Sequence, residues 1–319
     1  MAYEHIPVML AEVIELLDPK PGNIFVDGTV GGSGHAAAVC NAIAPNGIFI
    51  GLDQDRDAID NANRVLKDFK TTIHLFHGNF IEMPAFLSQL NIPAVDGILL
   101  DLGIAFHHVA ASGRGFSFNK DEPLDMRMDT RSRIDARELV NSLDEAELRR
   151  LFQRYGEERW AGKIARRIVL ERKGRAIDSS KQLADIVCRT VPKAAWKPGF
   201  HPATRIFMAL RIAVNKELKR LEQFLETGMD FLKPGGRICV LSFHSLEDRI
   251  VKQRFRALEN PCTCPPDLPV CGCGLKPTLK VFTKKARRPT AEEIMANPMA
   301  RSTKLRVAEK LWNRKKANG

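Results

Sequence analysis

The sequence predicts an α/β fold: a Rossmann-like, mainly parallel sheet interrupted by an inserted all-helical domain. Over the first hundred residues, short apolar runs alternate with helix-length segments, which is typical of βαβ units. From about residue 109 to residue 202 the sequence carries mainly helical patterns, and a strand pattern returns further on. Three of the predicted strands end in an aspartate, and a glycine-rich turn follows the first of them.

The predicted strands bring three carboxylates to one edge of the sheet. Strands are expected at 24–26, 47–52, 72–76 and 95–100, with helices at 35–44 and 58–69 between them. In open parallel sheets the ligand lies beyond the carboxyl ends of the strands. Asp27, Asp53 and Asp101 follow three of these strands, so we expect them to lie at one site.

The middle of the chain predicts helices. Ser142 with Glu145 matches a capping box, and an apolar stripe at i, i+3, i+4, i+7 and i+8 starts at Ala161. A long helix is expected over 202–225, followed by a strand over 237–243. The expected parts are a first sheet segment at 1–108, a helical substrate-recognition insertion at 109–202, a second sheet segment at 203–260, and a Cys- and Pro-rich loop with a basic tail at 261–319, packed on the sheet domain.

Charge indicates a polyanionic partner. The 319 residues carry a net charge of +11, and 13 basic but only 3 acidic residues lie within 275–319. A basic segment on a nearly neutral body favours nucleic acid, although a solvated tail that aids solubility is the alternative. No stretch approaches the ~20 apolar residues that cross a bilayer, and residues 1–10 do not resemble a secretory signal. We therefore expect a cytoplasmic protein without membrane contact.

The seven cysteines do not suggest a disulfide framework, because their number is odd. Four of them form two C-x-C pairs, enough thiolates for a structural zinc site. C-x-C is tighter than the usual zinc knuckle, so reduced thiols in a Pro-rich loop are the favoured alternative. The four cysteines are Cys262, Cys264, Cys271 and Cys273.

The glycine-rich turn predicts a nucleoside cofactor. Gly32-x-Gly34-x-x-Ala37, followed by Asp53, matches the dinucleotide fingerprint, in which the acid accepts hydrogen bonds from ribose. This pattern alone does not separate NAD from S-adenosylmethionine. Asp27 directly before the turn would repel a pyrophosphate and could instead order the loop or meet an amino-acid moiety. Asp101 could accept a hydrogen bond from an exocyclic amine; a strand-end cap is the alternative.

Longer strings carry a family resemblance over almost the whole chain. The sequence resembles the bacterial small-subunit (16S) rRNA cytosine-N4 methyltransferase family, known as RsmH or MraW. The matching strings are HIPVML from His5, DGTVG from Asp27, RGFSF from Arg114, PLDMRMD from Pro123, YGEER from Tyr155, HPATR from His201, ALRIAVN from Ala209, SFHSLEDR from Ser242 and RSTKLR from Arg301.

The resemblance implies a class I methyltransferase with a helical domain inserted after the fourth strand. It implies S-adenosylmethionine as the methyl donor and, as the acceptor, a cytosine in the decoding centre of 16S rRNA in the small ribosomal subunit. Asp101 would be the catalytic residue; for Phe80 core packing is the alternative. The cofactor contacts implied for this sequence are Ser33, Gly34, His35, Asp53, Phe80, Asp101 and His108, beside Asp27 and Gly32 of the turn.

The chain departs from the family pattern at two places. Ser33 replaces a glycine, a mild change if its φ is negative. After Asp101-Leu-Gly the family usually has two serines and then a glutamine and an aspartate, whereas this chain has Ile104-Ala-Phe-His-His108. Imidazole can still donate a hydrogen bond, so we expect activity to be retained.

Several residues are candidates for RNA contact. Arg114, Arg127, Arg205 and Arg211 could bind phosphates or instead pair with acids such as Asp125. Phe116 could stack on a flipped base or pack in the core. His244 could position RNA or cap the strand before it. The alternative functions are a non-catalytic RNA-binding ribosome-assembly factor and an NAD-linked dehydrogenase.

Overall fold

The computed structural model describes residues 7–265 and 272–312. Contacts divide the chain into two compact units. The first comprises Met1–Gly103 and Leu218–Gly319, and the second Ile104–Glu217. An insertion therefore interrupts the first unit, as the sequence predicts.

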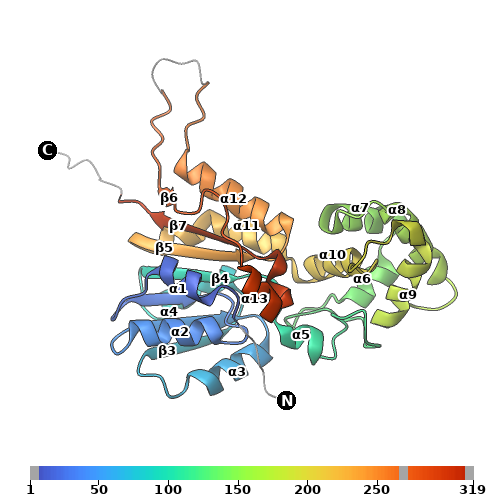
Figure 1. Ribbon diagram of the computed structural model, residues 1–319, viewed down its shortest axis with the longest axis horizontal. Helices are drawn as coiled ribbons and strands as arrows, with labels where there is room; N and C mark the ends of the chain where they lie inside the picture. Colours follow the sequence, from blue (N-terminus) through green and yellow to red (C-terminus); the bar gives the residue numbers. More distant parts are fainter. Residues whose placement is uncertain (1–6, 266–271, 313–319) are drawn as a thin grey trace. The chain divides into compact units, whose positions relative to one another are not determined.

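The first unit contains a seven-stranded sheet of order β3-β2-β1-β4-β5-β7-β6 (Figure 1). The first five strands in this order pair in parallel, whereas β7 is antiparallel to both β5 and β6. The strands are β1 Ile24–Asp27, β2 Ile48–Asp53, β3 Thr72–His77, β4 Val95–Asp101, β5 Leu232–Ser242, β6 Leu279–Val281 and β7 Lys304–Lys310.

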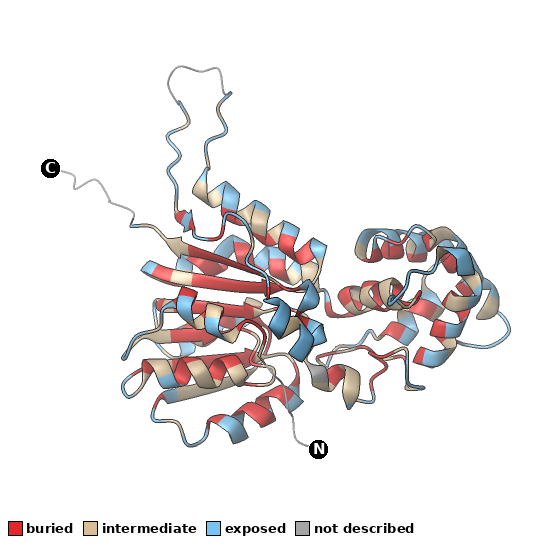
Figure 2. Cartoon of the chain, in the orientation of Figure 1, coloured by how far each residue is buried: buried red, intermediate tan, exposed pale blue. Residues whose placement is uncertain are grey.

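Helices cover both faces of this sheet, which explains why its central strands are apolar runs. Alternate strand residues enter different cores: Val26 packs with residues of α4, α11 and α12, whereas its neighbour Phe25 packs with residues of α1, α2 and α3. Buried positions accordingly continue along the central strands (Figure 2). The helices are α1 Leu10–Leu17, α2 Gly34–Ile43, α3 Arg56–Leu66, the 3-10 turn η1 Phe80–Glu82, α4 Met83–Gln89, α11 Glu217–Thr227, the turn η3 Gly228–Phe231 and α12 Ser245–Glu259.

The second unit is helical and has its own core. The predicted apolar stripe lies on α8, where Ile164 and Ile168 are fully buried and pack with Phe152 of α7 and Leu210 of α10. Hydrophobic periodicity was therefore sufficient to locate this helix. Its elements are α5 Phe106–Ala110, α6 Ala136–Ser142, α7 Glu145–Gly156, α8 Ala161–Glu171, α9 Ser180–Thr190, the 3-10 turn η2 Lys193–Ala195 and α10 Thr204–Asn215.

Two details of the helices differ from expectation. Ser142 ends α6, and the capping box belongs to Asp144 and Glu147 at the start of α7. The long helix expected over 202–225 is two helices, because Lys216 adopts φ 52° and ends α10. α10 packs in the core of the second unit, so that unit extends to Glu217 beyond the expected boundary at residue 202.

The segment expected to be loop and tail contributes part of the sheet. In β7, Leu305 and Val307 are fully buried on one face, whereas Arg306 faces Asp248 of α12. The short helix α13 Ala291–Ala296 and the 3-10 turn η4 Pro298–Ser302 precede β7. The basic composition of this segment concealed its alternation of apolar and polar residues. None of the helices in the described ranges combines the length and apolar character needed to cross a membrane.

Candidate active site

The three predicted carboxylates end three neighbouring strands. Asp27 is the last residue of β1, Asp53 of β2 and Asp101 of β4, and β1 lies between the other two strands. The sequence prediction that acids end these strands is therefore confirmed.

Hydrogen bonds tie the glycine-rich turn to all three strand ends. The backbone N–H of Thr29 donates to Asp27 Oδ1 at 2.9 Å, and the N–H of Asp101 donates to the Thr29 hydroxyl at 2.6 Å. The N–H of Gly31 donates to Asp53 Oδ2 at 2.9 Å. Asp27 thus orders the loop, one of the two roles considered for it. Thr29, which was not singled out in the sequence, links Asp27 to Asp101.

The two residues that open α2 are tightly constrained. Ser33 has φ 67°, so the condition of a negative φ is not met, and its hydroxyl is 3.4 Å from Nδ2 of Asn61. A side chain in this left-handed region costs about 1 kcal/mol or more. Gly34 has no room for one, because a Cβ there would lie 2.8 Å from Pro7. The loop therefore needs glycine at 34, and serine at 33 is strained.

His35, in the first turn of α2, reaches the acid of β4. Its Nε2 donates to the carbonyl oxygen of Val8 at 2.9 Å, and its Nδ1 lies 3.5 Å from Asp101 Oδ2. A carbonyl oxygen only accepts hydrogen bonds, so Nε2 carries a proton. The interaction of Nδ1 with the Asp101 carboxylate is favourable when Nδ1 is protonated as well. Burial alone would lower the pKa of His35, but Asp101 and Asp27 raise it above its ordinary value. These contacts favour an imidazolium.

Two carboxylate oxygens at this edge are buried without a hydrogen-bond partner among the described residues: Asp27 Oδ2 and Asp101 Oδ1. Burial raises the pKa of Asp27 to about 7, against the opposing effects of the Thr29 N–H and the charge of His35. Such oxygens are costly unless a donor reaches them. The ammonium of an amino-acid moiety and an exocyclic amine are donors of the required kind. The residues present therefore fit S-adenosylmethionine and an amine acceptor.

Phe80 lies between the turn and the core. Only 7% of it is exposed, and its ring meets that of Phe224 edge-to-face at 5.4 Å. A Cβ on Gly28 would lie 2.9 Å from the Phe80 Cβ, so Phe80 also packs against the start of the turn. These contacts show the core packing that was the alternative role for Phe80, and its contact with the cofactor stays a prediction.

The predicted residues after β4 belong to the second unit. Nδ1 of His108 accepts from the N–H of Ala105 at 3.1 Å, and its ring lies 5.0 Å from that of Phe116, which is 7% exposed. Nη1 of Arg114 donates to the carbonyl oxygens of Arg127 and Met128, both at 3.0 Å. These side chains support the local structure; their cofactor and RNA contacts stay predictions.

The other three predicted residues on the helical insertion also have protein partners. Arg127 makes a bidentate ion pair with Asp125, both contacts at 2.7 Å, and Arg211 does the same with Glu217 at 2.9 Å. Nη1 of Arg205 donates to the carbonyl oxygen of Glu157 at 2.7 Å. Ion pairing was the alternative considered for these arginines. Any phosphate contact would have to share them with these partners.

His244 caps α12. It is the N-cap residue, its Nδ1 accepts from the N–H of Glu247 at 3.4 Å, and its Nε2 lies 3.1 Å from a Glu247 carboxylate oxygen. The structure thus gives it a capping role, on the helix after β5 rather than on the strand. A role in positioning RNA stays a prediction.

Three of the four clustered cysteines lie close together. The sulfur atoms of Cys262, Cys264 and Cys273 all lie within 4.8 Å of one another. Cys271 lies outside the described residues. The grouping is separate from the strand-end carboxylates in sequence and in fold, because it follows α12.

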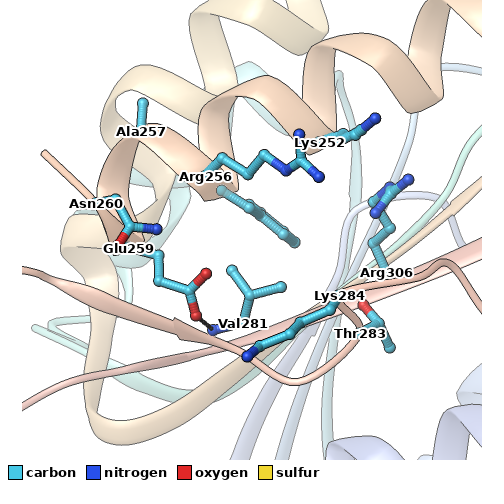
Figure 3. Close-up of a pocket in the computed structure, with 10 residues that line it drawn as sticks. Lys252, Arg256, Ala257, Glu259, Asn260, Val281, Thr283, Lys284 and Arg306 are labelled. Atoms are coloured by element: carbon cyan, nitrogen blue, oxygen red, sulfur yellow. Dashed lines mark hydrogen bonds between the residues drawn. The ribbon is translucent and has the colours of Figure 1, made fainter. Parts of the chain in front are cut away.

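A basic pocket lies between α12 and β6, and it was not predicted. Its volume is about 590 Å³, and Lys252, Arg256 and Lys284 line it together with Glu259 and Arg306 (Figure 3). Arg306 pairs with Asp248, and Glu259 accepts the N–H of Val281. The i, i+4 spacing of Lys252 and Arg256 places both on one face of a helix, so the sequence could have revealed these two basic residues of the pocket.

The fold and the site together define a class. A parallel sheet of order β3-β2-β1-β4-β5 with a reversed strand β7, a glycine-rich turn after β1 and acids ending three strands make a Rossmann-like methyltransferase that uses S-adenosylmethionine. The chain belongs to the MraW methylase family, whose model matches residues 2–311. The predicted fold class, enzyme class and cofactor are confirmed, and the dehydrogenase and non-catalytic alternatives are not favoured.

Curated relatives match over nearly their full length. A protein of Desulforapulum autotrophicum named ribosomal RNA small subunit methyltransferase H is 56% identical over 309 residues, which cover 97% of this chain and 99% of the relative. Proteins of the same name from Desulfosudis oleivorans and Syntrophotalea carbinolica are 52% and 49% identical. The match to the Desulfosudis protein covers 98% of this chain and 100% of that protein, and the match to the Syntrophotalea protein covers 97% of this chain and 98% of that protein.

Proposed function

We propose that this protein methylates the N4 amine of a cytosine in the decoding centre of 16S rRNA, within the small ribosomal subunit in the cytoplasm. The observation that carries the chemistry is Asp101, whose Oδ1 is buried and lacks a hydrogen-bond partner among the described residues. The printed names of the relatives support ribosomal RNA of the small subunit as the substrate.

Asp101 suits an amine that is a weak nucleophile. The lone pair of an exocyclic cytosine amine is delocalised into the ring. A carboxylate oxygen that accepts one of its N–H groups increases electron density on the nitrogen and fixes its orientation. His35 holds the other oxygen of Asp101, so Oδ1 keeps one direction. The methylated nitrogen then loses a proton to water, and no strong base is needed.

The cofactor supplies an electrophilic methyl group on a sulfonium. Asp53 and the turn from Gly31 to Gly34 would hold the nucleoside end, because acids at this position accept ribose hydroxyls. Asp27 Oδ2 would accept the ammonium of the amino-acid end, which would also remove the cost of burying that carboxylate. The chain thus contributes mainly the positioning of two reactants.

RNA binding rests on positive charge. Lys252, Arg256 and Lys284 surround one pocket, and none of the three has an ion pair within the described part of the chain (Figure 3). Unpaired cations at a concave surface suit the phosphates of RNA. The helical insertion and the rest of the basic tail would add further contacts.

The test is methyl transfer from labelled S-adenosylmethionine to small ribosomal subunits from cells lacking this activity, followed by nucleoside mass spectrometry. We expect label in N4-methylcytidine. Asp101→Ala should reduce kcat by about a hundredfold or more, comparable with removing one preorganised electrostatic interaction, while cofactor binding measured by calorimetry remains. Label in another nucleoside would reject the acceptor, and full activity of Asp101→Ala would reject the role of Asp101.

A further inference from the structure

The cysteines after α12 are not explained by methyl transfer. Figure 1 shows two arms of chain running side by side between α12 and β6. Cys262 and Cys264 lie on the first arm and Cys273 on the second, and their sulfur atoms are all within 4.8 Å of one another. Thiolates around a tetrahedral zinc ion are about 3.8 Å apart, given zinc–sulfur distances of about 2.3 Å. The three sulfurs are thus close to the separation that one ion requires.

Apolar packing does not explain this convergence. None of the described residues in 261–265 and 272–277 is buried, and Leu275 is 52% exposed. At the base of the arms, the N–H of Thr278 donates to the carbonyl oxygen of Leu258 at 2.9 Å. Segments without a core of their own are commonly held by a metal or a covalent link.

The remaining cysteines differ in their surroundings. Cys40 and Cys239 are fully buried in the sheet core, and burial raises the pKa of Cys40 to about 12 and that of Cys239 well above its ordinary value. Both belong to the packed core on one face of the sheet, so their burial is explained without a metal. Cys188 lies on α9 in the second unit, with its sulfur 3.6 Å from Nε2 of His201. Among the cysteines in the described ranges, only those on the arms are both accessible to solvent and close to one another.

We propose that Cys262, Cys264 and Cys273 bind a zinc ion that holds the two arms together. Zinc is the divalent ion that best suits several thiolates in a tetrahedral arrangement. Each thiol gives up its proton on binding, and the fourth position is open to water or a further ligand. The site is structural, since it lies after α12 and not among the strand-end carboxylates.

The test measures metal and does not depend on methylation. Full-length protein is purified under reducing conditions with zinc supplied, and its metal content is determined by plasma mass spectrometry. We expect one zinc per chain. Replacing it with cobalt should give the absorption bands of tetrahedral thiolate coordination. Cys262→Ser, Cys264→Ser and Cys273→Ser should each weaken zinc binding by more than about tenfold, the lower end of what even outer-shell changes cost.

Cys188→Ser is the matched control and should keep the full metal content, because its side chain lies in the second unit. Limited proteolysis checks the structural role: removal of zinc by a chelator should increase cleavage within residues 261–265 and 272–277. Absence of zinc from the reduced wild-type protein, or full retention of zinc in the triple serine variant, would overturn the site. Unchanged cleavage after zinc removal would overturn the structural role.

Discussion

His35 Nδ1 lies 3.5 Å from Asp101 Oδ2, while the other ring nitrogen donates to the carbonyl oxygen of Val8. The histidine is therefore held from both sides, and its protonated form attracts the Asp101 carboxylate in the observed orientation. The contact joins the first turn of α2 to the end of β4, and Asp101 Oδ1 remains buried without a partner among the described residues. A positioning role for His35 in catalysis follows from this geometry.

Replacement of His35 by glutamine tests that role. Because Asp101 and Asp27 raise the pKa of His35, the imidazolium persists below that pKa and is lost as the pH rises through it. We expect wild-type kcat to fall on the alkaline side, when Nδ1 becomes a second acceptor facing Asp101. His35→Gln should lower kcat about tenfold, the equivalent of one hydrogen bond, and should abolish this alkaline decline.

The pH profile distinguishes positioning from mere support of the fold. Asp27→Asn serves as the control for the second charge that faces His35. In this variant Asp27 no longer raises the pKa of His35, so the decline in kcat should shift toward lower pH. An unchanged profile in His35→Gln would show that another group causes the decline.

Asp27 destabilises the folded protein when it is ionised. Its pKa is raised from 3.8 to about 7, so between these values the folded state retains a proton that the unfolded state has lost. The free energy of unfolding should therefore decrease as the pH rises through this window, by about 1.4 kcal/mol per unit from this group. Asp27→Asn should remove that slope. Urea denaturation across the window measures it, and equal slopes in both proteins would contradict the assignment.

The sequence predicted the positions of the strand-end acids, which depend on local pattern. Asp27, Asp53 and Asp101 were found because each acid directly follows an apolar run, and strand ends share an edge of a parallel sheet. The bridge from Thr29 to Asp101 and the contact of His35 with Val8 were not found. They depend on which strands and loops become neighbours in space, and spacing along the chain does not encode this.

In the fold, too, features set by local sequence pattern were predicted, and features set by neighbours in space were not. Periodicity located α8, but it did not separate α10 from α11, because the apolar pattern continues across Lys216. β7 was missed because its basic residues suggested a solvated tail. β7 lies between β5 and β6, with Leu305 and Val307 buried and Arg306 paired with Asp248, and these partners are distant in the sequence.

Ser33 should be replaceable with a gain in stability. Its φ of 67° lies in the left-handed region, which glycine adopts without steric cost. Both Ser33→Gly and Ser33→Ala remove the hydroxyl that faces Asn61, but only the glycine relieves the strain. We expect the glycine variant to exceed the alanine variant by about 1 kcal/mol in free energy of unfolding. Chemical denaturation provides the comparison, and equal stabilities would show that the strain is absent in solution.

Asp248 stabilises the junction between α12 and β7. Its Oδ1 accepts from Arg306 Nε at 2.6 Å and its Oδ2 from Lys304 Nζ at 2.8 Å. Burial alone would raise the pKa of Asp248, but these two cations hold it below its ordinary value. The stabilisation is therefore present above the ordinary pKa and is lost as the pH falls through the lowered one. Asp248→Asn should cost about 3 kcal/mol at neutral pH, since it leaves Arg306 buried without its counter-charge.

Acid should remove the difference between wild type and Asp248→Asn. As the pH falls through the lowered pKa of Asp248, the wild-type carboxyl approaches its neutral form, and the two proteins should unfold at more similar urea concentrations. A difference that persists unchanged in acid would indicate that packing, and not charge, accounts for the destabilisation.

The basic pocket between α12 and β6 should govern affinity for RNA but not the chemical step. Lys252, Arg256 and Lys284 line it, and a substitution that removes one phosphate interaction should reduce the slope of log affinity against log salt by about 0.7 to 0.9. Single alanine variants should therefore raise KM for ribosomal subunits and leave kcat at saturation unchanged. Lys20→Ala is the control, because Lys20 is exposed but paired with Asp18. If the pocket variants and the control show the same affinity and salt slope, RNA binds elsewhere on the protein.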